Sequence, residues 1–223
     1  NALDKMKKKK AIVIFSISVL ISLGIIFKSE TIYLYELTKI IIKIKRTNAD
    51  ITDYKYFDNI TIPKSKDPKS WPLHNNFNEV ISTKKLDSTH KDLGTVAFLI
   101  IKNDSIWYEN YYEGYNKNSL SNSFSIAKSI VAALLGRSIN EGYLSGLDHK
   151  VGDFIPEFST GLAQNLTVGD LSSMSSGMKW TEDYKNIFGV TARAYVGTGL
   201  EKLIKSRPTI SEPGISFEYL SGD

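Results

Sequence analysis

The feature that most constrains this chain is an uncharged, apolar run near its N-terminus. Residues 11–27 (AIVIFSISVLISLGIIF) carry no charged side chain and directly follow the four lysines at 7–10. At about 1.5 Å per residue, a helix of this length reaches roughly 25 Å, close to the thickness of the hydrocarbon core of a bilayer. Lysines ahead of an apolar run hold the N-terminus in the cytoplasm. The pattern therefore predicts one transmembrane anchor, with the rest of the chain outside.

Two alternatives compete with an anchor. A cleaved signal peptide usually has a shorter apolar stretch that ends at a small-x-small site, whereas this run ends in Phe27-Lys28-Ser29-Glu30. A buried core helix does not account for the preceding lysines. We therefore expect residues 1–10 to be a cytoplasmic basic leader and residues 11–27 to be a single-pass membrane anchor. Secretion, or release to the periplasm after signal cleavage, is the alternative.

The positive charge of the chain belongs to this N-terminal region. The formal net charge is +4, and residues 1–30 hold six lysines and two acidic residues. The other 193 residues therefore hold 22 basic and 22 acidic side chains. Because a nucleic-acid-binding domain concentrates cations on its folded surface, we expect no nucleic-acid partner. The chain has no cysteine, which excludes a disulfide framework, a thiolate zinc site and a cysteine nucleophile.

The rest of the sequence predicts an α+β fold. Residues 28–93 form one region, a helical or extended neck followed by a loop-rich lead-in with three prolines. A domain at 94–223 follows. It opens with two alternating runs, 95–102 and 105–112, that flank Asn103-Asp104 and predict a β-hairpin. Apolar spacing and capping residues then predict helices at 125–140, at 167–175 with Thr167 as N-cap, and at 200–205.

The first candidate for chemistry is the sequence Ser125-Ile126-Ala127-Lys128. A serine in the first turn of a helix exposes its hydroxyl at the positive end of the helix dipole. A lysine three residues later lies on the same face, and an apolar environment favours the neutral lysine that a base requires. The same spacing at Ser82 and at Ser88 lies in a polar loop and opens no apolar helix. Taken alone, the motif also fits the start of an ordinary amphipathic helix.

The order of several motifs strengthens this candidate. In chain order they are Phe124-Ser125-x-x-Lys128, Glu141-Gly142-Tyr143-Leu144, Leu147-Asp148, Ile155-Pro156-Glu157-Phe158, Leu166-Thr-Val-x-Asp-Leu171-Ser-Ser-Met174-Ser-Ser-Gly177, Trp180 and Pro213-Gly214-x-x-Phe217-x-Tyr219. This series resembles the serine β-lactamase and penicillin-binding-protein superfamily over about residues 94–223. It is most similar to the class C-type branch of esterases, D-aminopeptidases and nylon-oligomer hydrolases. The resemblance implies a β-lactamase/transpeptidase-like fold, an antiparallel sheet flanked by helices with a helical subdomain.

The resemblance also implies roles for individual residues. Ser125 would be the nucleophile, Lys128 its partner, and Tyr219 the tyrosine that shares proton transfer with Lys128. Two residues after this tyrosine the family commonly has asparagine, whereas this chain has Ser221, which we expect to contact substrate and which favours the nylon-hydrolase-like subgroup. Tyr-x-Asn also occurs at Tyr108 and Tyr184, but the first precedes the nucleophile and the second follows Trp180 too closely.

Other chemistries fit the sequence less well. His74, His90 and His149 stand in polar stretches, match no metal-ligand spacing and are expected to be solvated. No glycine-rich phosphate loop follows a strand, so we expect no metal and no cofactor.

The expected function is a serine hydrolase anchored in a bacterial cell membrane, with its catalytic domain outside the cytoplasm. It acts through an acyl-enzyme on an ester or amide carbonyl of a small-molecule or peptide-like substrate, a β-lactam included. A non-hydrolysing penicillin-binding sensor or cell-wall receptor of the same fold is the alternative, and a pseudoenzyme used for structural contact is a third. The chain ends at Asp223, before the K-T-G or H-x-G strand that family members carry. We therefore expect a truncated piece that neither folds completely nor turns over substrate by itself; its oligomeric state stays open.

Overall fold

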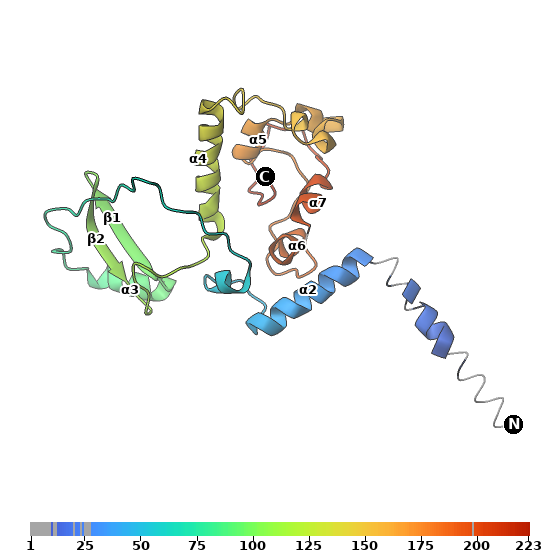
Figure 1. The fold of residues 1–223 in the computed structure, drawn as a ribbon, viewed down its shortest axis with the longest axis horizontal. Coiled ribbons are helices and arrows are strands. Elements are labelled where there is room, and N and C mark those ends of the chain that lie inside the picture. Colours follow the sequence, from blue (N-terminus) through green and yellow to red (C-terminus); the bar gives the residue numbers. More distant parts are fainter. Residues whose placement is uncertain (1–9, 11–12, 20, 23, 25–27, 198) are drawn as a thin grey trace. The chain divides into compact units, whose positions relative to one another are not determined.

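The computed structural model describes residues 10, 13–19, 21–22, 24, 28–197 and 199–223 (Figure 1). The chain divides into two compact units. One is Ala49–Phe124, and the other joins Ser125–Asp223 with the N-terminal segment up to Asn48. The division falls directly before Ser125, so the candidate nucleophile and all that follows it belong to one unit.

The unit Ala49–Phe124 contains the predicted hairpin. Strand β1 (Ala97–Lys102) pairs antiparallel with β2 (Ser105–Tyr111). The turn residues Asn103 and Asp104 have φ values of 49° and 56°. Positive φ at both central residues is what a two-residue type I′ turn requires, and asparagine and aspartate tolerate it well. The hairpin prediction is confirmed.

The lead-in before the hairpin contains two elements that the sequence analysis did not predict. One is a short 3-10 turn at Asp53–Tyr56, and the other is helix α3 (Lys84–Leu93). Helix α3 escapes an apolar-periodicity search because it is mostly polar, and its one buried residue is His90. The His90 ring lies 4.7 Å from that of Phe98 and 4.9 Å from that of Tyr112, measured between centroids. The expectation that His90 is solvated is therefore wrong, whereas His74 and His149 are partly exposed.

In the other unit, helix α2 (Lys28–Ile44) occupies most of the predicted neck. Its Tyr33 and Leu37, one turn apart, are buried, and α2 contacts α6 (Val190–Val196). Among the described residues, no helix combines the length and the apolar character that crossing a membrane demands. Positions 11–12, 20, 23 and 25–27 of the expected anchor lie outside the described residues.

The segment after Ser125 is built from short helices. These are a 3-10 turn at Phe124–Ile126 leading into α4 (Ala127–Asn140), 3-10 turns at Val151–Asp153, Pro156–Phe158 and Gly161–Asn165, then α5 (Val168–Ser172), α6 and α7 (Leu200–Lys205). The predicted α4 and α7 are confirmed. The predicted helix at 167–175 is shorter than expected, but it begins with the expected capping box between Thr167 and Asp170. Helix α6 was not predicted.

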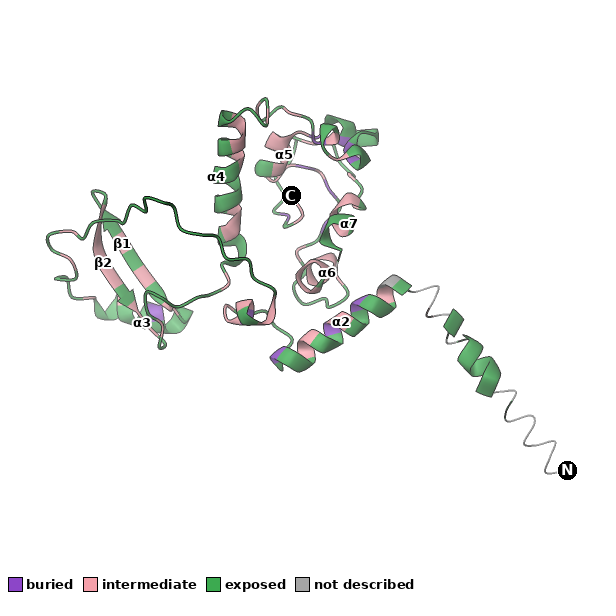
Figure 2. Ribbon diagram, viewed as in Figure 1, coloured by how far each residue is buried: buried purple, intermediate pink, exposed green. Residues whose placement is uncertain are grey.

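A small core holds the 3-10 turns and helices α5, α6 and α7 together (Figure 2). Seven residues with at most 7% of their surface exposed form it: Val151, Phe158, Ala163, Leu166, Met178, Trp180 and Leu220. They come from the 3-10 turns, from the segment after α5 and from the end of the chain, and α5, α6 and α7 pack around them. The core therefore ties the Tyr219 region to the middle of the unit. Helix α4 contributes none of these residues, and its Ile130, Val131 and Leu134 are more than half exposed.

The turn after α5 supports the segment that leads to Tyr219. The Met174 carbonyl accepts a hydrogen bond of 2.8 Å from the Glu218 N–H, and the Ser175 carbonyl accepts one of 2.8 Å from the Gly214 N–H. The Gly177 carbonyl accepts a third, also of 2.8 Å, from Ile210. The Met-Ser-Ser-Gly motif is therefore a backbone template for residues 210–218.

Gly177 is the position in this template that tolerates a side chain least. It has φ +67°, and an added Cβ would overlap the backbone of Ser211. We expect Gly177→Ala to lower the free energy of unfolding by about 2–4 kcal/mol, because the left-handed backbone and the backbone overlap both oppose it. Gly161→Ala is the matched control: Gly161 has φ +62° with open space around it, so about 1 kcal/mol is expected. Urea unfolding of both variants measures the difference, and equal losses would contradict the template.

Candidate active site

Ser125 lies at the entry to helix α4. It sits within the 3-10 turn Phe124–Ile126 and is exposed to solvent. The preceding residue, Phe124, has φ 45°, a left-handed conformation that is uncommon for a bulky side chain. Strained residues of this kind concentrate at functional sites. The local backbone is therefore unusual at the position where the sequence predicts a nucleophile.

Two side chains converge on the Ser125 hydroxyl. Lys128 Nζ donates a hydrogen bond of 3.2 Å to Ser125 Oγ, and the Tyr219 hydroxyl donates one of 2.8 Å. Lys128 Nζ also lies 5.1 Å from the centroid of the Tyr219 ring and donates over 3.4 Å to Ser221 Oγ. The structure thus brings together all four residues that the sequence analysis selected.

Leu220 explains how Tyr219 and Ser221 come to face Ser125. The Leu220 side chain is 2% exposed and belongs to the core, whereas Tyr219 is 41% exposed. Burial of a leucine side chain contributes roughly 1.5–3 kcal/mol, and it fixes the segment with its two neighbours outside the core. Gly222 completes the arrangement, because any Cβ there would meet the ring of the buried Trp180.

The electrostatics of the site favour proton loss from Tyr219. The hydrogen bond with Ser125, and after it the contact with Lys128, lower the pKa of the Tyr219 phenol below its ordinary value. Both contacts favour the phenolate, since a hydroxyl can donate to it and an ammonium attracts it. A phenolate next to a serine hydroxyl is a candidate general base.

Glu182 is a residue near this site that the sequence analysis did not select. One carboxylate oxygen accepts from the Ser221 N–H, and the other accepts from the Tyr184 hydroxyl over 2.5 Å. Burial raises the pKa of Glu182, but the hydrogen bonds from Tyr184 and Ser221 outweigh it and lower the pKa overall. The sequence marks Glu182 as a possible site residue, because it stands two residues after the Trp180 motif. The sequence does not show that Glu182 pairs with a backbone N–H 39 positions later.

The competing motifs belong to the other unit or are engaged with other partners. Ser82, Ser88 and Tyr108 belong to the other unit, and the Ser88 hydroxyl donates to the Lys85 carbonyl over 3.0 Å, which engages it with the backbone of α3. Tyr184 lies in the same unit as Ser125, but its hydroxyl is engaged with Glu182. Within the described chain, no group of three or more histidine, aspartate or glutamate side chains is arranged to hold a metal ion.

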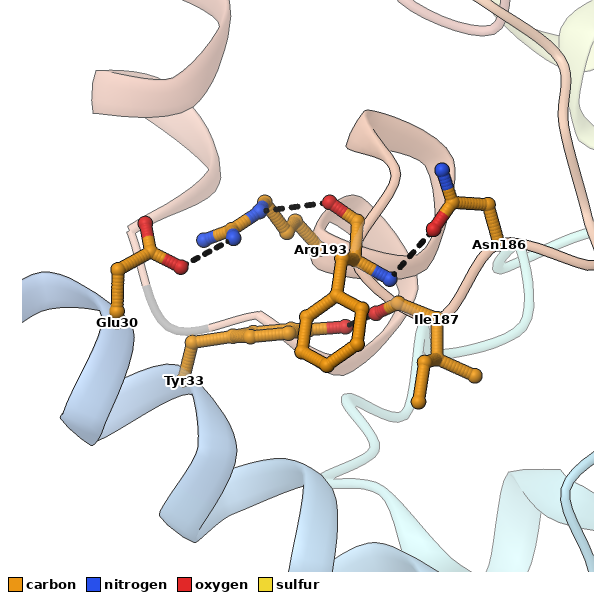
Figure 3. A network of polar contacts seen from close by, with 6 residues as sticks. Glu30, Tyr33, Asn186, Ile187 and Arg193 are labelled. Carbon is orange, nitrogen blue, oxygen red and sulfur yellow. Dashed lines mark hydrogen bonds and ion pairs between the residues drawn. The ribbon is translucent and has the colours of Figure 1, made fainter.

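The segment that carries Glu182 is held at its far end by a polar network (Figure 3). Arg193 forms an ion pair with Glu30 of α2 and lies over the Tyr33 ring, 4.4 Å from its centroid. The Tyr33 hydroxyl donates to the Ile187 carbonyl, and Arg193 Nε donates over 3.2 Å to the Phe188 carbonyl. Helices α2 and α6 therefore fix the backbone of residues 187–188.

A cavity of about 530 Å³ lies beside this network, lined by residues of α2, α6 and α7, Tyr33 among them, and by Phe188 before α6 and Arg207 after α7. None of Ser125, Lys128 and Tyr219 lines it. The cavity is therefore separate from the candidate active site, which is open to solvent at Ser125 and Tyr219.

A solved structure described as "Putative 6-aminohexanoate-dimer hydrolase from Bacillus anthracis" matches with a TM-score of 0.56 at 20% sequence identity, covering 69% of this chain and 45% of that one. The likeness shows a β-lactamase-like fold, with helices and a small antiparallel sheet. This chain spans less than half the length of that structure. A search of curated protein sequences gave no match.

The family follows from a second comparison. The model of the family described as "Beta-lactamase" matches residues 83–222, more than half of the chain. The chain therefore belongs to the beta-lactamase family, as the order of its motifs indicated.

Proposed function

We propose that this protein is a serine hydrolase that cleaves an ester or amide through an acyl-enzyme on Ser125. The observation that carries the proposal is the shared position of Ser125 Oγ, which accepts hydrogen bonds from both Lys128 and Tyr219. A serine hydroxyl needs an adjacent base to become a nucleophile, and Tyr219, whose pKa is lowered, contacts this one.

The proposed reaction begins with the Tyr219 phenolate accepting the Ser125 proton while Ser125 Oγ attacks the carbonyl carbon. The Lys128 ammonium stabilises the phenolate before the transfer and the negative charge that develops on Oγ. Collapse of the tetrahedral intermediate breaks the bond to the leaving alcohol or amine, which takes the proton from Tyr219. Water then attacks the acyl carbon and gives its proton to Tyr219. The bond to Ser125 Oγ breaks, Oγ takes that proton back from Tyr219, and the acid is released.

Membrane attachment is a separate proposal. We infer from the lysines at 7–10 and the apolar run at 11–27 that the N-terminus anchors the protein in a bacterial cell membrane with the catalytic unit outside the cytoplasm. Alkaline carbonate extraction of membranes tests it. Retention of the protein in the membrane pellet supports the anchor, and release into the supernatant contradicts it.

A fluorophosphonate probe tests the hydrolase proposal on the full-length protein. We expect one adduct, located by peptide mass spectrometry on Ser125, and steady turnover of a chromogenic ester. A β-lactam adduct on Ser125 that persists without turnover would instead favour the non-hydrolysing sensor. Absence of any adduct on Ser125 would contradict both functions.

A further inference from the structure

We propose that Glu182 is a positioning residue for Tyr219, acting through the backbone of Ser221. The proposal rests on the serine hydrolase function proposed above. Glu182 accepts the Ser221 N–H with one carboxylate oxygen, so it fixes the peptide group two residues after the tyrosine. Hydrogen bonds in which the acceptor is ionised are about twice as strong as neutral ones, and the lowered pKa of Glu182 keeps it ionised.

This contact holds the Tyr219 segment directly after the tyrosine. Before the tyrosine, the Glu218 N–H donates to the Met174 carbonyl over 2.8 Å, and after it Leu220 is buried in the core. Beyond Ser221, the Asp223 carboxylate accepts from the Ser176 hydroxyl over 2.6 Å. The bond from Glu182 is the directional contact at the Ser221 N–H itself. It thereby sets the place of Ser221 Oγ, which accepts from Lys128, and helps to direct the Tyr219 ring.

Glu182 is itself held rigidly, as a positioning group must be. Its second oxygen accepts from Tyr184. The segment around it closes on itself, because the Thr191 hydroxyl donates to the Thr181 carbonyl over 2.6 Å. Its far end is fixed by Tyr33 and Arg193 (Figure 3). The segment 181–188 is therefore hydrogen-bonded to α6 at its start, and to α2 and α6 at its end.

The charge of Glu182 is used for hydrogen bonding, not for an ion pair. No lysine, arginine or histidine in the described part of the chain forms an ion pair with it. Its donors are the Tyr184 phenol and the N–H of Ser221, two residues after the candidate base, which points to a role in aligning the site.

Acylation kinetics of the full-length protein test the proposal. With a chromogenic ester or a fluorophosphonate, the maximal acylation rate and the reagent concentration at half-maximal rate are measured separately. We expect Glu182→Ala to lower the maximal rate about 10- to 100-fold, since a misplacement of about 1 Å has effects of this size, with little change in the half-maximal concentration. Glu182→Gln should retain the rate within about threefold, because its amide oxygen still accepts the Ser221 N–H.

Asp183→Asn is the matched control. It removes a carboxylate from the neighbouring residue, which accepts a local hydrogen bond of 3.1 Å from the Lys185 N–H, and it should acylate like the wild type. If Glu182→Ala does not fold, Glu182→Met fills a similar volume without an acceptor and replaces it. Wild-type acylation by Glu182→Ala, or a loss confined to the half-maximal concentration, would overturn the positioning role. Equal losses in the Gln and Ala variants would overturn it too. A wild type that is not acylated on Ser125 would instead refute the proposed function.

Discussion

Replacing Ser125 with alanine is expected to abolish covalent labelling and to reduce ester hydrolysis by a factor of roughly 10⁴ or more. This large loss of activity is expected because Ser125 is the proposed nucleophile, and without Oγ no acyl-enzyme can form. Lys128 and Tyr219 also lose the group that both contact. Fold stability should hardly change, because Ser125 is exposed and its hydroxyl contributes to no core contact. The measurements are intact-protein mass after fluorophosphonate treatment and initial rates with a chromogenic ester.

Ser129→Ala is the control for this experiment. Ser129 is an exposed serine in the first turn of α4, one residue beyond Lys128. The substitution removes a serine hydroxyl from the same helix end and leaves the proposed nucleophile in place. Labelling that survives Ser125→Ala, or that disappears in Ser129→Ala, would show that the nucleophile lies elsewhere.

The elements that the sequence predicted well are those with a local cause. The turn at Asn103-Asp104 needs only two residues that tolerate positive φ, and the hairpin follows. The cap of α5 needs only Thr167 and Asp170, which are three residues apart and form the reciprocal bonds of a capping box. Helix α4 needs only apolar spacing. In each case the energetic reason lies within a few residues, where a single sequence can display it.

The failures have non-local causes. Helix α3 is polar and is held through His90, whose aromatic neighbours Phe98 and Tyr112 stand in and beside the hairpin strands. Glu182 acquires its role from a backbone group near the end of the chain. Neither pairing leaves a spacing that a single sequence reveals.

The candidate site combines both situations. The closeness of Ser125 and Lys128 is local, since helical spacing places them on one face. The closeness of Tyr219 to Ser125 spans 94 positions, and only the motif order of a resembling family suggested it. The physical cause is visible in the structure: the Met174–Gly177 turn and the buried Leu220 carry the tyrosine to the start of α4. The apolar spacing in α4 correctly predicts a helix, but it does not show which residues cover the apolar face. In the structure Ile130, Val131 and Leu134 on that helix are exposed.

Replacing Tyr219 with phenylalanine is expected to reduce the acylation rate by about 10²–10⁴-fold, the usual contribution of a general base. The variant keeps the ring, and with it the packing beside Lys128, but loses the hydroxyl that contacts Ser125. Tyr143→Phe is the control, because the Tyr143 side chain is 75% exposed and takes no part in the site. An acylation rate in Tyr219→Phe within threefold of wild type would leave Lys128 as the base and refute the role of the tyrosine.

The pH dependence of acylation tests the same assignment without removing the tyrosine. If the Tyr219 phenolate accepts the serine proton, the rate rises with pH as the phenol ionises. The midpoint lies below the ordinary tyrosine value because Ser125 and then Lys128 lower this pKa. Glu182 opposes them, since its negative charge raises the pKa of Tyr219.

In Lys128→Met the ammonium is gone, the pKa of Tyr219 rises, and the acid limb of the pH–rate profile should move to higher pH. In Glu182→Gln a negative charge is gone, and the limb should move to lower pH. Shifts of the acid limb in opposite directions in the two variants would show that the base is influenced by both charges. The loss of a contact that only stabilised the fold would lower the acylation rate at every pH without moving the acid limb.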